Sequence, residues 1–232
     1  MKVLVVENYD NTGLGQMRAA LDEAGASIDL VRAHRGEPLP DGHEGYDAIV
    51  VLGGGQNALA DDDHPYLPAL AGLMRAFADN GKSTLGICLG SQVLARAYGA
   101  DNLIGVAPEF GWQRVSLTPE GKADPVLAAL PESFPIFQWH DDTFTLPRGG
   151  TRLAGNDAAH NQAFRIGRAG YGIQFHFEAD RKLVAEWHAA FPEVIARKEG
   201  WLEKYSSEAG THGPTADEAG IAIARAWVAT IR

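Results

Sequence analysis

Cysteine is the scarcest residue in this chain, with one in 232 residues. A lone cysteine cannot form a disulfide within the chain, which is typical of a reducing compartment and predicts a cytoplasmic protein. Basic residues are also few: 20 Lys and Arg stand against 30 Asp and Glu, giving a formal net charge of -10. Nucleic acids and anionic membranes attract basic surfaces, so we expect neither as a partner.

Long apolar runs are missing as well. The apolar segment at residues 3–6 turns polar at Glu7, so it is too short for a signal sequence or a membrane span and is predicted to be a strand. One cysteine cannot supply a spaced zinc set. The acidic residues 61–63 are interpreted as a solvated loop that caps a helix, and the glycines at 53–55 lack the Gly-Lys-Ser/Thr continuation of a phosphate loop. We therefore expect no metal and no cofactor.

Strand and helix patterns alternate through the first part of the chain. Short apolar runs typical of buried strands lie at residues 3–6, 28–31, 47–52 and 83–87, and helical spacing lies at residues 14–24, 65–80 and 91–98. This order predicts an α/β fold with an open, mostly parallel sheet flanked by helices on both faces. In such sheets, ligands bind beyond the carboxyl ends of the strands.

The pattern changes after about residue 104. Short strand candidates separated by Pro and Gly suggest antiparallel additions at the sheet edge, at residues 115–117, 134–139, 144–146, 151–154 and 163–166. Later segments are predicted as a core strand at 171–177, a helix at 181–198, a polar linker at 206–215 and a closing helix at 216–231. We expect residues 1–200 to form one domain, with residues 201–232 packed on it as a linker and helix.

The single cysteine, Cys88, stands between Gly86 and Gly90 where a predicted strand meets a predicted helix. A strand, a tight glycine-flanked turn and a helix form the geometry that exposes a nucleophile at the top of an α/β sheet. The positive end of the following helix favours the thiolate form. The alternative is a buried structural cysteine, which is the commoner fate of a lone Cys.

A cysteine nucleophile needs a base, and the chain has eight histidines that could supply one. His176 and Glu178 lie at the end of the predicted strand at 171–177, and if the chain stays extended their side chains point to the same side. A carboxylate there could hold one imidazole nitrogen and orient the other toward the thiol. The alternative is a strand end with two unrelated polar residues. His140 is the less favoured candidate base.

Together the two motifs, Gly-Ile-Cys-Leu-Gly-Ser-Gln at residues 86–92 and Gly-Ile-Gln-Phe-His-Phe-Glu at residues 172–178, resemble the class I glutamine amidotransferase domain over about residues 1–190. The resemblance implies the flavodoxin-like fold of that family. The segments at 109–112 and 139–144 are similar to parts of stand-alone members related to the amidotransferase domain of GMP synthase. We expect some of these residues to form the rim of the substrate pocket; the alternative for both segments is aromatic packing under a loop.

The resemblance implies roles for particular residues. Cys88 would attack the side-chain carboxamide of glutamine to form a γ-glutamyl thioester, His176 would act as base and then acid, and Glu178 would orient His176. The other implied contacts are backbone donors and substrate-binding positions: Gly54 and Leu89 in the oxyanion hole, and Gly53, Gly55 and Gln92 at the substrate.

Two positions depart from the family pattern. Gly55 stands where the family usually has proline, which predicts a less preorganised oxyanion loop. Phe177 stands where the family usually has the proline of His-Pro-Glu. Neither change removes a catalytic group.

Two enzymatic hypotheses follow from the resemblance. In the first, the protein hydrolyses glutamine and passes ammonia to a separate synthase, since the rest of the chain is too short to hold a synthase domain. In the alternative, it is a stand-alone hydrolase of γ-glutamyl compounds. A third, less favoured hypothesis is a non-catalytic, redox-sensing module that uses the thiolate alone.

Overall fold

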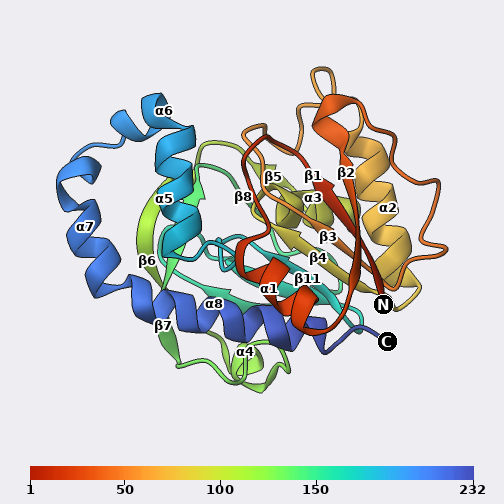
Figure 1. Cartoon of the computed structure of the whole chain (residues 1–232). Coiled ribbons are helices and arrows are strands. Elements are labelled where there is room, and N and C mark those ends of the chain that lie inside the picture. The colour runs from red at the N-terminus through yellow and green to blue at the C-terminus, as the bar shows by residue number, and fades with distance from the viewer.

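A nine-stranded sheet crosses the centre of the molecule, and helices cover both of its faces (Figure 1). The computed structural model describes all 232 residues. The strand order in the sheet is β2-β1-β3-β4-β11-β10-β9-β6-β7. This arrangement confirms the predicted α/β fold with a large, mostly parallel sheet flanked by helices.

One half of the sheet is parallel. Its strands are β2 (Ser27–Arg32), β1 (Lys2–Glu7), β3 (Ala48–Val51), β4 (Ser83–Ile87) and β11 (Gly170–Ile173). In β1, Val3 and Val5 point into one hydrophobic cluster, while Leu4 and Val6 point into a second cluster on the opposite face. Burial on both faces explains why these strands appear as continuous apolar runs in the sequence.

The other half of the sheet is antiparallel. It consists of β10 (Ala163–Ile166), β9 (Thr151–Gly155), β6 (Glu109–Leu117) and β7 (Ser133–His140). The strand predicted at residues 144–146 is not at the edge of this sheet. Instead β8 (Thr143–Phe144) pairs with β5 (Asn102–Leu103) in a separate two-stranded sheet.

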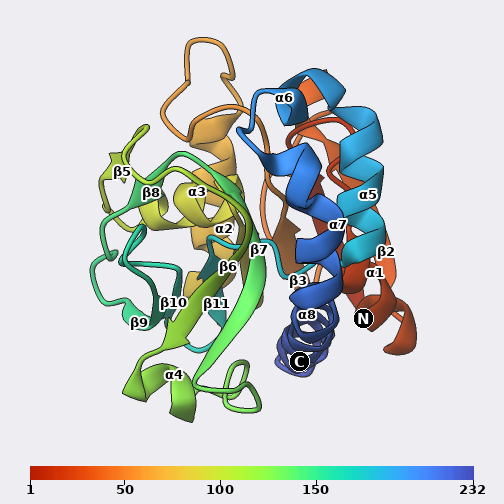
Figure 2. The same ribbon diagram turned by 90° about the vertical axis from the view of Figure 1, so that its left-hand side faces the viewer.

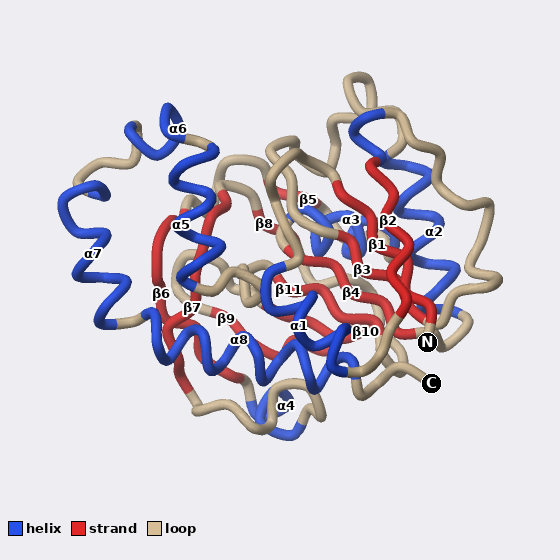
Figure 3. Tube along the Cα trace, in the orientation of Figure 1, coloured by secondary structure: helices blue, strands red, loops and turns tan.

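The helices form two layers (Figures 2 and 3). The layer on one face contains α2 (Leu67–Asp79) and α3 (Leu89–Ala97). On the other face, α1 (Gly15–Glu23) lies beside the C-terminal α8 (Gly213–Val228). The remaining helical segments are α4 (Pro119–Ala123), α5 (Arg181–Ala190), α6 (Pro192–Ala196), α7 (Trp201–Thr211) and the short η1 (Ala33–Arg35). None of the helices has the length and apolar character needed to span a membrane.

Several predicted element boundaries are wrong. The core strand predicted at 171–177 ends at Ile173, so the segment carrying the candidate base continues beyond β11. The helix predicted at 181–198 breaks between α5 and α6. Phe191 has φ -124 and ψ 49, because proline disfavours helical backbone at the residue before it. Pro192 then begins α6 in the first turn, where a missing N–H costs nothing.

The linker predicted at 206–215 is mostly helical. Helix α7 extends to Thr211 and α8 begins at Gly213. The composition of this segment is polar, but Trp201, Tyr205 and Ala209 recur every four residues and pack against the core. Tertiary packing of this stripe stabilises a helix whose other faces are polar.

Candidate active site

Cys88 occupies the turn between β4 and α3, at the carboxyl edge of the parallel strands. Its backbone has φ 52 and ψ -111, and it is one of two non-glycine residues with positive φ. Strain of this kind persists where the surrounding structure enforces it, as at a nucleophile elbow. The Cys88 N–H donates to the carbonyl of Ile173 at 2.9 Å, which ties the turn to β11.

The two glycines around Cys88 are required by close backbone approach. A Cβ on Gly86 would collide with the Gly90 carbonyl, and a Cβ on Gly90 would collide with the Val51 carbonyl. Small residues at these positions allow α3 to start directly above the ends of β3 and β4. The thiol consequently lies above the sheet, with Cys88 only 6% exposed.

His176 and Glu178 lie next to this turn, although neither is on a strand. The backbone N–H of His176 donates to the carbonyl of Phe137, which fixes the segment against β7. His176 Nδ1 is 2.7 Å from Glu178 Oε1. Since a carboxylate only accepts, Nδ1 carries a proton and Nε2 is the nitrogen free to face the thiol.

The electrostatics of His176 are set by burial and two negative groups. Burial lowers the pKa of His176, but the charges of Glu178 and Cys88, together with hydrogen bonds to both, raise it well above the ordinary value of 6.5. The edge of the Trp187 ring covers the imidazole, with centroids 5.1 Å apart. Such an environment favours an imidazolium that is paired with a carboxylate on one side and a sulfur on the other.

The predicted oxyanion donors, Gly54 and Leu89, are in direct contact. A Cβ on Gly54 would lie 2.8 Å from Leu89 Cδ2. Neither residue's backbone N–H donates in any of the turn, loop and cap hydrogen bonds of the protein. Unengaged N–H groups beside a thiol, one of them at a helix N-terminus, are suited to hold a negative oxygen.

Side chains that the sequence analysis did not single out hold the glycine loop. Gln56 Nε2 donates to the Asn8 carbonyl at 3.0 Å and to the Tyr66 hydroxyl at 2.6 Å. Asn8 Nδ2 donates to the Leu52 carbonyl at 2.7 Å, directly before Gly53. These contacts fix the loop at both ends. No short motif marks them, since each joins residues far apart in the sequence or in an irregular turn.

Cavities lie on two sides of Cys88. One, of about 310 Å³, is lined by Gln92 and Leu89 among others, and the other, of about 340 Å³, is lined by His176 and Glu178. Gln92 is buried, and its Nε2 donates to Gln174 Oε1 at 3.2 Å. This bond fixes the Gln92 side chain in the wall of the cavity of about 310 Å³.

The other two predicted substrate residues, Gly53 and Gly55, do not border the same cavities. Gly55 borders both cavities, whereas Gly53 borders only the one that contains His176. A Cβ on Gly53 would lie 3.2 Å from His176 Cε1 and 3.4 Å from Cys88 Cβ. Gly53 therefore leaves the space through which the thiol and the imidazole meet.

His140, the less favoured candidate base, faces a different carboxylate. Its Nε2 lies 3.1 Å from Glu109 Oε2, and its Nδ1 donates to the Asp142 carbonyl at 3.0 Å. Glu109 accepts from Asn156 and Gln162, both at 2.6 Å. His140 Nε2 forms no hydrogen bond with Glu109 despite the 3.1 Å distance, and Nδ1 is bound to the Asp142 carbonyl. Neither contact involves Cys88, and the Nδ1 bond holds the loop that borders the first cavity.

Two polar clusters elsewhere have their own partners. Glu7, Asp10 and His34 bring ligand-type atoms within 4.8 Å of one another. However, His34 Nε2 binds Asp10 at 2.9 Å, its Nδ1 binds the Glu7 carbonyl at 3.0 Å, and Arg35 Nε donates to Asp10 at 2.9 Å. In the acidic loop, Asp61 pairs with Arg96 at 2.6 Å. We assign a metal to neither cluster.

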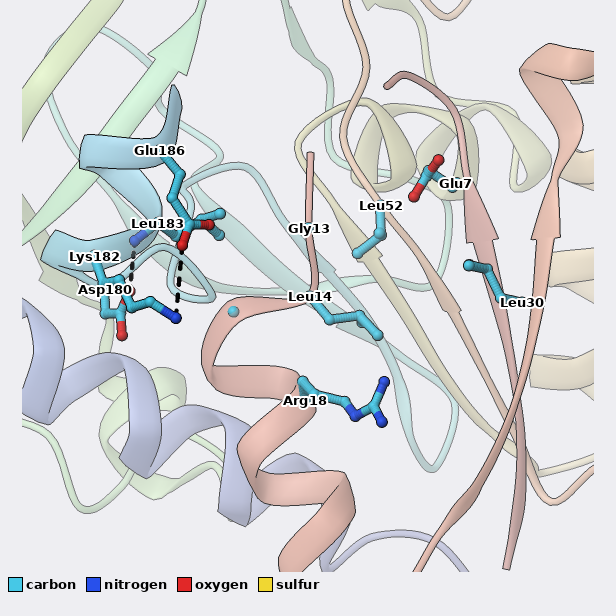
Figure 4. Close-up of a pocket in the computed structure, with 11 residues that line it drawn as sticks. Glu7, Gly13, Leu14, Arg18, Leu30, Leu52, Asp180, Lys182, Leu183 and Glu186 are labelled. Atoms are coloured by element: carbon cyan, nitrogen blue, oxygen red, sulfur yellow. Dashed lines mark hydrogen bonds and ion pairs between the residues drawn. The ribbon is translucent and has the colours of Figure 1, made fainter. Parts of the chain in front are cut away.

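A further cavity of about 420 Å³ lies between α1 and α5 (Figure 4). Its lining combines apolar side chains, Leu14 and Leu52 among them, with charged side chains such as Arg18 and Lys182. Lys182 pairs with Glu186 at 3.6 Å along α5. The lining contains no cysteine, serine or threonine, so we place the reactive site at Cys88.

The fold and this turn define an α/β protein that carries a buried thiol where a central strand meets a helix. The sequence model described as "Glutamine amidotransferase class-I" matches residues 4–185, and the chain belongs to that family. A glutamine-hydrolysing GMP synthase subunit from Methanospirillum hungatei is 29% identical over 202 residues, covering 84% of this chain and 95% of the relative.

Two other comparisons agree. Gamma-glutamyl peptidase 5 of Arabidopsis thaliana is 30% identical over 172 residues, covering 71% of this chain and 66% of the relative. The crystal structure of a glutamine amidotransferase from Thermotoga maritima superposes with a TM-score of 0.83 at 30% identity, covering 98% of this chain and 96% of that one. The family resemblance inferred from the two sequence motifs is therefore confirmed.

Proposed function

We propose that this protein cleaves γ-glutamyl amides through a thioester on Cys88. The Cys88 sulfur attacks the γ-carbonyl carbon, and its proton passes through His176 Nε2 to the leaving nitrogen as the C–N bond breaks. Water, deprotonated by His176, then attacks the thioester and releases glutamate and the thiol. Glu178 keeps His176 in the required tautomer, and the N–H groups of Gly54 and Leu89 stabilise the oxyanion, typically by a few kcal/mol.

One observation carries this proposal: a buried imidazole joined to Glu178 at 2.7 Å that lines the same cavity as the thiol of a strained turn residue. A structural cysteine needs neither the strained backbone nor a carboxylate-held histidine. Gln92, Gly53 and Gly55 line the two cavities at this thiol, which supports their assignment to substrate binding.

Glutamine is the first candidate substrate, with ammonia as the released product. Support comes from relatives named as subunits of glutamine-hydrolysing GMP synthase, one of which this chain covers over 95% of its length. On this hypothesis ammonia passes to a separate synthase partner, and the reaction takes place in the cytoplasm, where a lone thiol stays reduced.

A γ-glutamyl peptidase is the second candidate. The relative named gamma-glutamyl peptidase 5 supports it. So does the cavity of about 340 Å³ on the His176 side of the thiol, which is much larger than a departing ammonia requires.

The test is glutamate release from purified protein incubated with glutamine and with γ-glutamyl peptides, combined with trapping of Cys88 by a glutamine-analogue electrophile. Cys88→Ala should abolish turnover and trapping while leaving the circular dichroism spectrum unchanged. Turnover retained by Cys88→Ala would remove the thioester route. Inertness of the wild-type protein in both assays would remove the proposed function altogether.

A further inference from the structure

We propose that the cavity on the His176 side of Cys88 is a leaving-group subsite for an apolar α-amino acid, so that the preferred substrates are γ-glutamyl dipeptides such as γ-glutamylphenylalanine. This inference rests on the proposed thioester chemistry and, of its two candidate substrates, favours the γ-glutamyl peptide over glutamine. It concerns a space that the hydrolysis of glutamine leaves unused.

The two cavities at Cys88 would hold different halves of the substrate. The leaving nitrogen must take its proton from His176, so the leaving group lies on the His176 side of the sulfur. His176 borders the cavity of about 340 Å³ and not the one of about 310 Å³. The γ-glutamyl half is therefore assigned to the cavity lined by Gln92, and the amine half to the cavity lined by His176.

The size of the amine-side cavity exceeds what ammonia needs. A molecule as small as water takes about 30 Å³ of liquid volume, and pockets for small organic ligands begin at roughly 300 Å³. The amine-side cavity has about 340 Å³. It can therefore accept an amine that carries a side chain.

Aromatic rings form the wall of this cavity. Tyr9 and Trp139 both flank Phe191, with ring centroids 6.0 Å and 5.7 Å away. Tyr9 is 45% exposed, so part of its side chain is open to solvent at this wall. An apolar or aromatic side chain on the leaving amine would cover this surface.

One cation, Lys198, borders the same cavity. Its Nζ lies 4.0 Å from Asp141 Oδ1 and 5.0 Å from the Phe110 ring centroid. A long ion pair to an exposed carboxylate leaves donors of the ammonium available. The free α-carboxylate of a leaving amino acid is the group that this ammonium would bind.

The reaction balances without a co-reactant other than water. The amide bond of the γ-glutamyl dipeptide breaks, the nitrogen leaves as the amine of the free amino acid with the proton delivered by His176, and the acyl group stays on the Cys88 sulfur. Water then releases glutamate. The products are one glutamate and one free amino acid.

The substrate test compares four compounds on the full-length protein, with glutamate release as the common readout: glutamine, γ-glutamylglycine, γ-glutamylphenylalanine and γ-glutamylphenethylamide. We expect kcat/KM for γ-glutamylphenylalanine to exceed the values for glutamine and γ-glutamylglycine by about tenfold or more, as expected for a buried aromatic contact. Equal or better turnover of glutamine would overturn the subsite while leaving the thioester proposal intact. No glutamate from any compound would instead count against the proposed function.

Two variants test the wall and the cation separately. Tyr9→Ala removes an exposed ring and should lower kcat/KM for γ-glutamylphenylalanine about fivefold more than it lowers kcat/KM for glutamine. Lys198→Met should lower kcat/KM for γ-glutamylphenylalanine by about five- to tenfold. It should leave kcat/KM for γ-glutamylphenethylamide unchanged, because that compound has no carboxylate.

The matched control is Lys122→Met, which removes an exposed lysine that pairs with Glu132 at 2.9 Å. It belongs to α4, which lies at the opposite end of the molecule from α6 (Figure 2). This control should show wild-type kinetics with all four compounds. An equal loss for the dipeptide and the phenethylamide in Lys198→Met would show that the lysine does not bind the carboxylate, and would overturn that part of the assignment.

Discussion

At the scale of single residues, burial and charge act on the pKa of His176 in opposite directions. Glu178 supplies one of the charges that keep the imidazole protonated, and it also holds the Nδ1 proton. We expect Glu178→Gln to lower kcat by about 10²- to 10⁴-fold, because the amide can donate to Nδ1 and stabilise the wrong tautomer. Steady-state kinetics on the best γ-glutamyl substrate measure this. A loss as complete as that of Cys88→Ala would contradict an orienting role.

The same residue makes the stability of the fold depend on pH. Burial lowers the pKa of His176, yet Glu178 and Cys88 raise it well above 6.5. A raised histidine pKa contributes stability that is fully present below about pH 6.5 and is lost as pH rises through the raised value. The gap in melting temperature between wild type and Glu178→Gln should therefore be widest near pH 6 and narrow toward alkaline pH. Parallel melting curves across this range would refute the charged pair.

Sequence motifs predicted the candidate residues that lie in short contiguous segments, such as Cys88, His176 and Glu178, and the structure brings these side chains together. Residues at the same site that act from irregular segments were not predicted. Gln56 contacts a carbonyl 48 residues away in the sequence, and Lys198 lies beyond the predicted motifs. A contact that depends on loop geometry leaves no spacing pattern, so sequence periodicity cannot detect it.

At the scale of elements, the glycine loop of residues 53–55 lacks the proline of the family pattern and is held by side-chain hydrogen bonds instead. Gln56 bridges the Asn8 carbonyl and the Tyr66 hydroxyl, and we expect these bonds to replace the rigidity that proline would give. Gln56→Ala should lower kcat by about tenfold with little change in KM, because a displaced donor weakens the transition state more than the ground state.

The control for this loop is Gln113→Ala, which removes an exposed glutamine whose Nε2 donates to the Phe110 carbonyl. It should leave kcat within about twofold of wild type. A KM effect with unchanged kcat would instead assign Gln56 to substrate binding.

The elements that sequence analysis placed well are those buried on both faces. Strand β4 has the predicted bounds because all five of its residues are buried and apolar or small. Boundaries failed where local chemistry and packing compete. Pro192 divides a helix whose apolar spacing continues across it, and α7 forms through Trp201 and its stripe despite a polar composition. Periodicity reports which face is buried, and it does not report where the chain turns.

At the scale of the whole molecule, the C-terminal helices connect the core to the site through aromatic rings. Trp201 stacks on Trp112 with centroids 5.9 Å apart and meets the edge of Phe110, which in turn contacts Trp139 at the active-site wall. Trp201 is only 2% exposed. We expect Trp201→Ala to cost about 3–5 kcal/mol of unfolding free energy by denaturant titration, whereas Leu202→Ala, at a position 62% exposed, should cost less than about 0.5 kcal/mol.

The last prediction concerns residues 201–232, which lie beyond the segment matched by the family model. We propose that they belong to the same folding unit as the preceding residues. Helix α8 places Ile223, Ala224 and Trp227, all fully buried, in the same cluster as Val3 and Val5 of β1. Each large apolar side chain removed from water contributes roughly 1.5–3 kcal/mol, and a domain is stable by only about 5–15 kcal/mol in total.

Truncation after Gly200 should therefore leave a chain that does not fold. Circular dichroism and size-exclusion chromatography of residues 1–200 would show lost helix and aggregation, and Cys88 would no longer be trapped by a glutamine-analogue electrophile. The matched shorter truncation ends at Val228, which keeps α8 but loses the Thr230 carbonyl that accepts from Arg168 Nη1 at 3.0 Å. We expect the chain of residues 1–228 to fold with a modestly lower melting temperature. A soluble, cooperatively melting fragment 1–200 would show instead that α7 and α8 are an addition to a fold that is complete without them.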